Sequence, residues 1–537
     1  MGRHAAGNGF LRAAVAERRG EPLWAYTPHE RSAGIFARMV REFDRSAETR
    51  WAPADRLDLI ARLGTLYLPE PSLCAAAQLR LRAGPASYSI CGVTHTTASH
   101  GAMEAITGLV TAPVMPWDAL VCTSQAVSAT IAMLIERENE YLRWRFGQSL
   151  RSMLPQLPVI PLGVHTADFQ FTPAERAAAR SALEIGEEEV VALFLGRLSF
   201  HAKAHPHPMY LGLQRTAERT AKKITLIQCG WFYNAPIEAA FRDGAARTCP
   251  DVRVLFTDGK EAKARRQSWA AADLFISLSD NIQETFGLSP IEAMAAGLPL
   301  IVTDWDGYRD TVRDGVDGFR IPTWMPSPGL GAHFAASYEA DAVNYDLYCG
   351  LTCQTISLDL GALTEHLSSL ICDPELRRRL GEAGRRRARE LFDWAVVYRK
   401  YQSLWAELEA IRRAARQDTS YQDLLQEAPR SAPARPDPFA GFAGYPTAPI
   451  EARTLVSLAP RAENDTYRAL LKHPLFDYAA RSLPAPDLAD AVLNSLRSEA
   501  QTVDALGIGL GLDLGTATRA IAVLAKMGLV ELSSDEG

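Results

Sequence analysis

Cysteine patterns typical of metal centres or disulfide frameworks are missing from this sequence. None of its eight cysteines forms a CxxC pair, and Cys349 and Cys353 have no second pair or histidine cluster to complete a zinc set. Several cysteines, such as Cys122 and Cys229, lie inside apolar runs. These patterns predict free, buried thiols in a reducing compartment.

Long apolar runs are missing as well. The first nine residues contain no apolar segment of the signal-peptide kind, and Ala6 stands where an N-myristoylation motif needs serine or threonine. No window is long and apolar enough for a transmembrane span. We therefore expect a cytoplasmic protein, in solution or peripheral at the inner face of the membrane.

An excess of charge of one sign is absent. The net charge is -6 over 537 residues, with 47% apolar and 22% charged residues, which is ordinary for a globular protein. This balance argues against nucleic acid or an anionic membrane as the main partner. There is no internal repeat, and the length corresponds to three or four domains at roughly 100–200 residues each.

Short apolar runs alternate with helical patterns between about residues 85 and 325. The runs are rich in Val, Ile, Leu and Phe and carry few charges, as strands buried on both faces do, so parallel, doubly wound sheets are expected. The predicted strands are 87–93, 119–123, 157–162, 190–195, 224–229, 252–256, 274–278 and 299–303.

Composition also predicts the domain limits. Residues 159–164 are typical of a hinge between two α/β domains, and a Pro-rich stretch near 428–438 is typical of a linker. The tail after it is helical again and ends in a helix and a short β-wing. The predicted segments are 1–165 (first α/β domain), 166–393 (second α/β domain), 394–415 (a helix crossing back), 416–455 (linker) and 456–537 (a small, mostly α, winged-helix-like domain).

The stretch 283–299 predicts a loop that leads into a helix. Ser289 would be the N-cap, Pro290 the first helical residue and Glu292 the partner in a capping box, and Gly297 would end the helix. The free N–H groups at the helix start and the helix dipole would form an anion site suited to a diphosphate.

Two carboxylates, Glu284 and Glu292, flank this predicted anion site with seven residues between them. Carboxylates are poor phosphate ligands but good acceptors for sugar and ribose hydroxyls. A capping box alone would account for Glu292, whereas Glu284 has no capping role. The backbone at Phe286, Gly287 and Leu288 completes the predicted donor-binding loop, since glycine lets a phosphate approach closely.

A basic pair, Arg197 and Lys203, follows the predicted strand 190–195. Open α/β sheets bind ligands at the carboxyl ends of their strands, so these side chains could neutralise a leaving diphosphate. Two solvated surface charges are the alternative interpretation.

The order of these motifs resembles glycosyltransferase family 4 over about residues 190–400. The matching positions are Gly196-Arg197-Leu198, Lys203, Gly230, 271–274, Glu284 with Glu292, Gly315 and Gly318-Phe319. The resemblance implies an α/β GT-B fold, in which two Rossmann-like domains face each other across a cleft. It also implies retention of the anomeric configuration, with no required metal or other cofactor.

The resemblance also implies roles for single residues. Glu284 would lie near the donor sugar and Glu292 near the ribose, while Arg197 and Lys203 would bind the donor phosphates. His95, at the end of the predicted strand 87–93, would lie near the reacting sugar, and a capped strand-end histidine is the alternative.

Three features depart from the family pattern or compete with it. Five residues separate Arg197 from Lys203, where the family more often has four. The N-terminal Gly2…Gly7-Asn8-Gly9 stands near the family's first glycine-rich loop, so either the true start lies upstream or the first sheet is one strand short. Asp304-Trp305-Asp306 matches a metal-binding DxD pattern but is interpreted as a loop near the donor phosphates.

The sequence therefore predicts a metal-independent, hexosyltransferase-type glycosyltransferase (EC 2.4). It would move a sugar from a nucleoside diphosphate sugar to a hydroxyl of a glycan, lipid or small-molecule acceptor, in polysaccharide, glycolipid or other glycan synthesis. Another GT-B enzyme, such as a phosphorylase or an epimerase, and a non-catalytic regulator that senses nucleotide sugars are the alternatives.

The tail resembles a winged helix, since 516–530 is typical of its second helix and turn. Residues 456–537 carry seven Lys and Arg against eleven Asp and Glu. DNA-binding modules need a basic face, so this balance argues against nucleic acid and favours a protein partner or a regulatory role.

Overall fold

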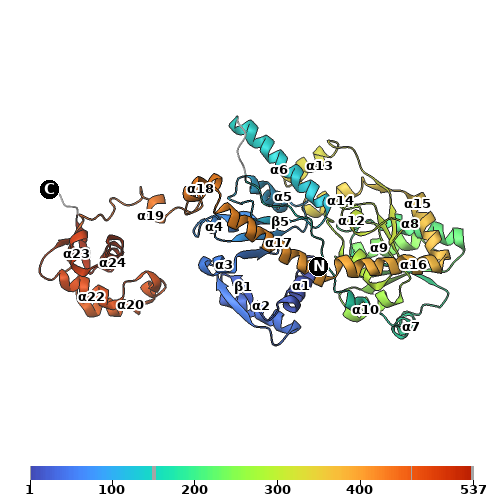
Figure 1. The fold of residues 1–537 in the computed structure, drawn as a ribbon, viewed down its shortest axis with the longest axis horizontal. Coiled ribbons are helices and arrows are strands. Elements are labelled where there is room, and N and C mark those ends of the chain that lie inside the picture. The colour runs from blue at the N-terminus through green and yellow to red at the C-terminus, as the bar shows by residue number, and fades with distance from the viewer. Residues whose placement is uncertain (1, 148–152, 461, 534–537) are drawn as a thin grey trace. The chain divides into compact units, whose positions relative to one another are not determined.

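The computed structural model describes residues 2–147, 153–460 and 462–533. The chain forms two compact units, Met1–Ala432 and Pro433–Gly537 (Figure 1). The first unit contains two α/β halves, each built on parallel strands. It holds all the residues that the sequence predicts to bind a donor.

The N-terminal half contains two small parallel sheets, β1-β2 and β3-β4-β5. Every residue of β4 and β5 is buried, as expected for apolar strands covered on both faces. The strands are β1 (Leu23–Thr27), β2 (Thr49–Pro53), β3 (Thr65–Leu68), β4 (Ser89–Val93) and β5 (Ala119–Val121). The helices are α1 (Gly2–Glu17), α2 (Glu30–Phe43), α3 (Leu57–Leu63), α4 (Leu73–Arg80), α5 (His100–Thr107) and α6 (Gln125–Phe146).

The second half is built on one parallel sheet of six strands in the order β11-β10-β9-β6-β7-β8. This is the doubly wound Rossmann order, and its topological switch point lies between β6 and β9. The strands are β6 (Val190–Leu198), β7 (Ile224–Phe232), β8 (Arg253–Asp258), β9 (Leu274–Ser277), β10 (Leu300–Thr303) and β11 (Gly318–Ile321).

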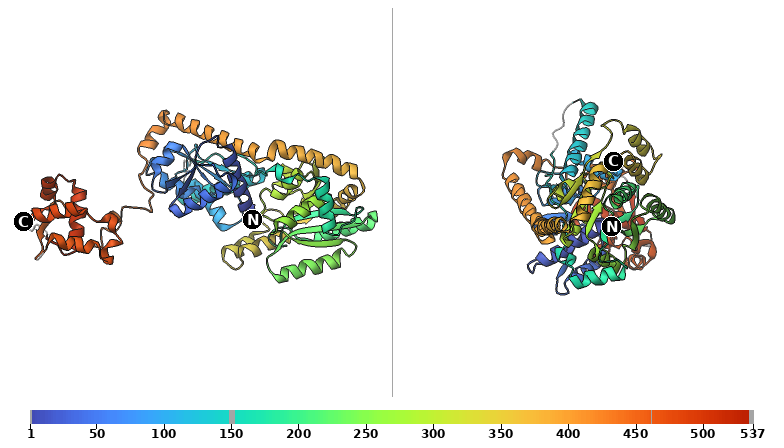
Figure 2. Two further views of the ribbon diagram at one scale, coloured as in Figure 1. Left: turned by 90° about the horizontal axis from the view of Figure 1, so that it is seen from below. Right: turned by 90° about the vertical axis from the view of Figure 1, so that its right-hand side faces the viewer.

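Helices cover both faces of this sheet (Figure 2). Ala192 and Phe194 of β6 pack in one apolar cluster, while Val191 and Leu193 pack in the other. This alternation is the reason that the strands are apolar throughout. One face carries α8 (His207–Thr220), α9 (Ala235–Thr248) and α15 (Leu360–Cys372), and the other carries α7 (Pro173–Ala182), α10 (Ala262–Ala271) and α11 (Leu288–Ala296).

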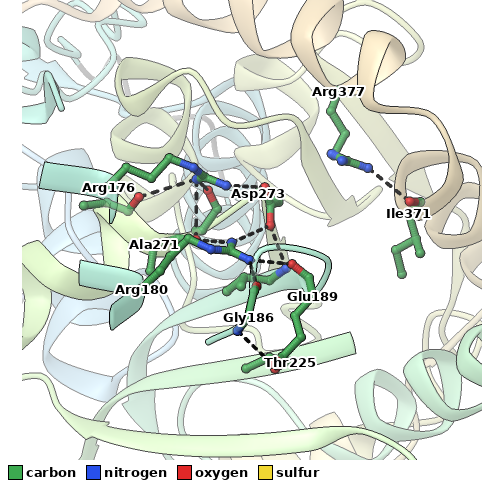
Figure 3. Close-up of polar contacts among 12 residues, drawn as sticks. Arg176, Arg180, Gly186, Glu189, Thr225, Ala271, Asp273, Ile371 and Arg377 are labelled. Atoms are coloured by element: carbon green, nitrogen blue, oxygen red, sulfur yellow. Dashed lines mark hydrogen bonds and ion pairs between the residues drawn. The ribbon is translucent and has the colours of Figure 1, made fainter. Parts of the chain in front are cut away.

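A buried carboxylate, Asp273, attaches α7 to this sheet (Figure 3). Arg176 lies 2.6 Å from Asp273 Oδ1, and Arg180 lies 3.2 Å from Oδ2. The backbone N–H of Val191 also donates to Oδ2, at 2.8 Å. The carboxylate therefore joins two turns of α7 to the first residues of β6.

The predicted strand 157–162 does not form. Its backbone makes only isolated bridges, including one between Val159 and Cys122. Pro158 and Pro161 have no N–H group, so a regular ladder cannot run through this segment. The chain then crosses from the first half to the second. It lies next to the segment that crosses back, because Val164 exchanges hydrogen bonds with Phe392 and Trp394.

The N-terminal glycines lie in α1, so the prediction of a glycine-rich loop there is wrong. A Cβ atom on Gly9 would collide with the Trp394 ring, and glycine therefore permits close packing at this point. Trp394 begins α17 (Trp394–Ala415), which packs against α1 and β4 (Figure 1). The long helix thus returns to the N-terminal half.

Further elements complete the first unit. No helix was predicted between 325 and 357, yet α13 (Ala332–Glu339) and α14 (Tyr345–Cys353) form there. Asp373 accepts from Leu376 N as the N-cap of α16 (Pro374–Arg387), and Pro374 occupies the first turn, where its missing N–H group is tolerated. The others are α12 (Tyr308–Thr311), β12 (Thr323–Trp324), β13 (Ser357–Leu358), the π-helical η3 (Ala388–Phe392) and α18 (Thr419–Gln426).

The second unit begins with α19 (Pro438–Gly441) and continues as a helical domain with a three-stranded antiparallel sheet, β15-β14-β16. The predicted last helix and wing are confirmed as α24 and β16. The strands are β14 (Leu455–Leu458), β15 (Gln501–Thr502) and β16 (Val530–Ser533), and the helices are α20 (Asn464–Leu471), α21 (Pro474–Asp477), α22 (Pro486–Ser495), α23 (Val503–Leu510) and α24 (Leu514–Lys526).

All eight cysteines are free thiols, as predicted. Six are buried, whereas Cys74 is half-buried and Cys372 is exposed. Among the described helices, none is by itself long and apolar enough to span a membrane, and only the bent pair α23–α24 reaches that length and composition together.

Candidate active site

The predicted donor-binding residues converge at the carboxyl ends of β6 and β9. These two strands are hydrogen-bonded neighbours, so the segments that follow them leave the sheet side by side. Lys203 lies in the segment after β6, and Glu284 lies in the loop between β9 and α11. The site therefore occupies the switch point of the sheet, where doubly wound folds bind ligands.

Lys203 and Glu284 form an ion pair between Nζ and Oε2. The side chains are only 18% and 14% exposed. Burial by itself would lower the pKa of Lys203, but the neighbouring Glu284 carboxylate raises it above its usual value. Burial would likewise raise the pKa of Glu284, and the Lys203 charge lowers it instead. Both groups are therefore held in their charged forms.

Arg197 is the last residue but one of the strand β6, and its side chain points to the same loop. Its Nη2 donates to Gln283 Oε1 at 2.9 Å and to the carbonyl oxygen of Ala202 at 2.9 Å. The unusual spacing between Arg197 and Lys203 thus does not separate the two cations, because each contacts one residue of the pair 283–284.

The helix α11 begins at Leu288, with Gly287 as its N-cap, so the predicted capping box at Ser289 is wrong. The N-cap is Gly287, with a φ of 83° and no side-chain cap, and Ser289 is already helical and buried. A Cβ atom at Gly287 would collide with the Tyr308 ring, so the positive φ and the close ring both require glycine. The first N–H groups of α11 are left for an anion, and Gly297 ends the helix in the left-handed conformation as predicted.

The remaining residues of this loop differ in their surroundings. Phe286 is 1% exposed and packs edge-on against Phe392, so its side chain belongs to the core and only its backbone can face a donor. Leu288 begins α11. Glu292 lies one turn further along without a capping role, and burial raises its pKa to about 7.

His95 lies just beyond the end of β4 in the N-terminal half, with its Nε2 atom 3.0 Å from the carbonyl oxygen of Pro69. Its neighbour Thr96 contacts the second half through a 3.0 Å hydrogen bond to the Tyr345 hydroxyl. His100 also reaches across, since its ring stacks on Tyr338 at 3.6 Å. His95 therefore belongs to the edge of the first half that meets α13 and α14.

Asp306 is a candidate site residue that sequence reasoning treated only as part of a DxD pattern. It follows β10, and burial together with the nearby charges of Glu284 and Asp310 raises its pKa to about 8. Its Oδ1 atom lies 3.5 Å from Ser124 Oγ in the first half. Its φ of 43° and its burial are set by tertiary packing, so no sequence signal pointed to it.

The other aspartate of that pattern, Asp304, lies 3.4 Å from Arg320 and 3.8 Å from Arg309. Among the described residues, no group of three or more His, Cys, Asp or Glu side chains is arranged to hold a metal ion.

A family match covers the segment of the chain that carries most of these residues. Residues 175–324 match the family model for glycosyl transferases group 1. The stretch includes β6, β9, α11 and the residues Arg197, Lys203, Glu284 and Asp306.

Two relatives illustrate the similarity. The chain is 25% identical over 277 residues to an alpha-maltose-1-phosphate synthase of Mycobacterium tuberculosis, which covers 51% of this chain and 61% of that protein. It is 32% identical over 188 residues to a D-inositol 3-phosphate glycosyltransferase of Geodermatophilus obscurus, which covers 34% of this chain and 39% of that protein. The matched region thus spans less than two thirds of either relative.

Among solved structures, that of Anabaena Alr3699/HepE in complex with UDP and glucose is similar over 75% of this chain and 96% of that chain, with 16% identity and a TM-score of 0.48. The matched region lies in the second of the two α/β halves, each of which is built on parallel strands. Residues 175–324 thus match the glycosyl transferases group 1 family, and the chain that contains them has the two α/β halves of a GT-B fold.

Proposed function

We propose that this protein is a retaining glycosyltransferase that uses a nucleoside diphosphate sugar as donor and a hydroxyl group as acceptor. The observation that carries the proposal is the convergence of Lys203 and Arg197 on the loop 283–287, beside the free amides of α11. Two cations and a helix N-terminus are what a diphosphate requires.

The donor would exchange partners with the residues present. Lys203 would move its charge from Glu284 to the phosphates, and Arg197 would move from Gln283 Oε1 to a phosphate oxygen. Glu284, which then has a free oxygen, would accept a hydroxyl of the transferred sugar. Glu292 would accept a hydrogen bond from a ribose hydroxyl. Its raised pKa favours a protonated, neutral carboxyl group before the donor binds.

In the reaction, the bond between the anomeric carbon and the phosphate oxygen breaks, and its electron pair leaves with the diphosphate. The acceptor oxygen forms its bond on the same face, and its proton passes to the leaving phosphate oxygen. Lys203, Arg197 and the amides of α11 stabilise the charge that develops on the leaving group. His95 would lie on the acceptor side of the reacting sugar.

The relatives support this proposal, because one is named a glycosyltransferase and the other a synthase of a sugar phosphate. We propose no acceptor beyond a hydroxyl compound, such as a glycan, a lipid or a small molecule. We also propose that the reaction needs no metal, so chelation with EDTA should leave the rate unchanged.

The proposal is tested by incubating the protein with UDP- and GDP-sugars and following the release of nucleoside diphosphate. Glu284→Gln keeps the shape of the side chain and should reduce release by about 10²–10³-fold, as loss of a transition-state contact does. Lys223→Met, which removes an exposed lysine from the same half, is the control. No release with any donor, or full release by Glu284→Gln, would contradict the proposal.

Product analysis separates the alternatives. A phosphorylase would release a sugar 1-phosphate when phosphate is supplied, and an epimerase would convert the donor without releasing a nucleoside diphosphate. A sensor would bind the nucleotide sugar and leave it intact.

A further inference from the structure

Asp306 lies where two loops of the site pack directly on each other. It occupies the segment after β10, next to Gly307. A Cβ atom on Gly307 would lie 2.5 Å from the Cα atom of Phe286, so this segment is in backbone contact with the loop that carries Glu284. The Asp306 carboxyl group therefore borders the predicted sugar position.

Three features of Asp306 are unfavourable for folding. Its φ of 43° lies in the left-handed region, which favours glycine. Its Oδ2 atom is buried and has no hydrogen-bond partner among the described residues. Its carboxyl group also lies close enough to Glu284 and Asp310 for their charges to oppose its ionisation.

Two hydrogen bonds compensate for these features only in part: the backbone N–H of Gly307 donates to the carboxyl group, and the Ser124 hydroxyl contacts Oδ1. The hydrogen bond from Ser124 to Oδ1 is 3.5 Å long, at the outer limit for such a bond. Glycine would relieve the positive φ and remove the unsatisfied oxygen. Strained, unsatisfied residues of this kind are concentrated at ligand-binding and catalytic positions.

We propose that Asp306 is a specificity-determining residue that binds a hydroxyl group of the transferred sugar, an inference that rests on the proposed function. Lys203 and Arg197 would bind the diphosphate. Asp306, whose segment contacts the loop that carries Glu284, would then be available to bind the sugar. A hydroxyl both donates and accepts, and it would satisfy the buried Oδ2 atom. The carboxyl group then selects sugars that carry a hydroxyl at that position.

The test compares binding of nucleoside diphosphates with binding of nucleotide sugars by isothermal titration calorimetry. The probes are UDP and GDP alone, UDP-glucose and GDP-mannose. Asp306→Gly should bind the nucleotide as the natural protein does, within about twofold, but bind the nucleotide sugar about tenfold more weakly, since one hydrogen bond is lost. Asp306→Asn, which keeps a donor and an acceptor, should stay within about threefold.

Asp341→Gly is the matched control. Asp341 also has a positive φ, of 54°, and it is exposed. Both glycine variants should raise the thermal unfolding midpoint, but only Asp306→Gly should weaken sugar binding. This difference separates a binding role from relief of backbone strain.

Two results would overturn the inference. If the natural protein binds a nucleotide sugar and Asp306→Gly binds it equally well, the inference is wrong while the proposed function survives. If the natural protein binds neither nucleoside diphosphates nor nucleotide sugars, both are wrong.

Discussion

Two carboxylates with buried oxygens, Asp118 in the first half and Asp306 in the second, have opposite surroundings. Both oxygens of Asp118 are saturated: they accept from Arg80 at 2.5 and 2.7 Å and from the N–H groups of Ile90 and Met115 at 2.8 Å. Asp118 and Arg80 are completely buried. This pair joins α4, β4 and the approach to β5, so its role is structural.

Asp306, by contrast, has a buried oxygen without a partner among the described residues and a strained backbone. The Lys203–Glu284 pair is intermediate, because it is paired but remains partly exposed. The comparison indicates that burial alone does not reveal a role. What distinguishes a binding position is the hydrogen-bonding capacity that the fold leaves unused.

The largest effect is expected at the saturated pair. Asp118→Asn removes the charge that compensates Arg80, and breaking a fully buried pair costs about 3–5 kcal/mol. Urea unfolding measures the loss, with Asp306→Asn as the control, which should not be destabilised. If the two variants were equally stable, the distinction between a structural role for Asp118 and a binding role for Asp306 would be wrong.

A loss of activity rather than of stability is expected at the intermediate pair. Lys203→Met removes a cation from the proposed diphosphate site and should lower kcat/KM by about 10²–10³-fold, as loss of a transition-state donor does. Steady-state kinetics measures the change against the control Lys223→Met. If kcat/KM stays within threefold of that control, Lys203 has no part in catalysis.

A pH effect is expected at the unsatisfied carboxyl group. The pKa of Asp306 is about 8 in the folded protein, above its usual 3.8, so its contribution to stability is complete below pH 3.8 and is lost as the pH rises towards 8. Asp306→Asn cannot ionise. Its free energy of unfolding relative to the natural protein should therefore increase by about 3–4 kcal/mol between pH 5 and pH 8.

Glu284 and Asp310 oppose the ionisation of Asp306, and Lys203 is paired with Glu284. Other groups with raised pKa values, such as Glu292, are common to both proteins and cancel in the comparison. A difference that does not change with pH would show that Asp306 ionises normally.

The smallest effect is expected where one carboxylate has two cationic partners. Arg176→Ala leaves Asp273 paired with Arg180 and should cost about 1 kcal/mol, the usual net value of such a hydrogen bond (Figure 3). Arg180→Ala should cost more, because the Arg180 side chain is only 10% exposed, against 39% for Arg176, and donates to the carbonyl oxygens of Gly186 and Glu189. Thermal unfolding of the two variants gives the order, and the reverse order would contradict this account.

Much of the second half could be predicted from sequence. Strands β6, β7, β9 and β10 overlap the predicted apolar runs because most of their residues are buried, and that burial excludes charge from the sequence itself. The edge strand β8 also overlaps its predicted run, although it is only partly buried. The proximity of Lys203 and Glu284 could also be predicted, although 81 residues separate them. Both follow strand ends, and strand ends of a parallel sheet share one edge.

Other features were not predictable. β1 and β2 are mostly half-buried, with one buried residue each and Arg50 exposed in β2, so they give no signal of strands buried on both faces. The capping box at Ser289 agreed with local preferences, but the Tyr308 ring beside Gly287 moved the start of the helix. Local preferences are weak, and a buried aromatic ring from a distant segment can outweigh them.

The order of apolar runs and polar strand ends in the sequence was enough to determine the α/β class, the second-half sheet and the loop that carries Glu284, because these depend on local composition and on general rules of chain topology. Only the tertiary structure decided that Asp306 is left strained and unsatisfied next to Glu284, whereas Asp118 is saturated. The hydrogen-bonding state of a buried carboxyl group depends on which distant groups the fold brings to it, and a linear pattern does not contain that information.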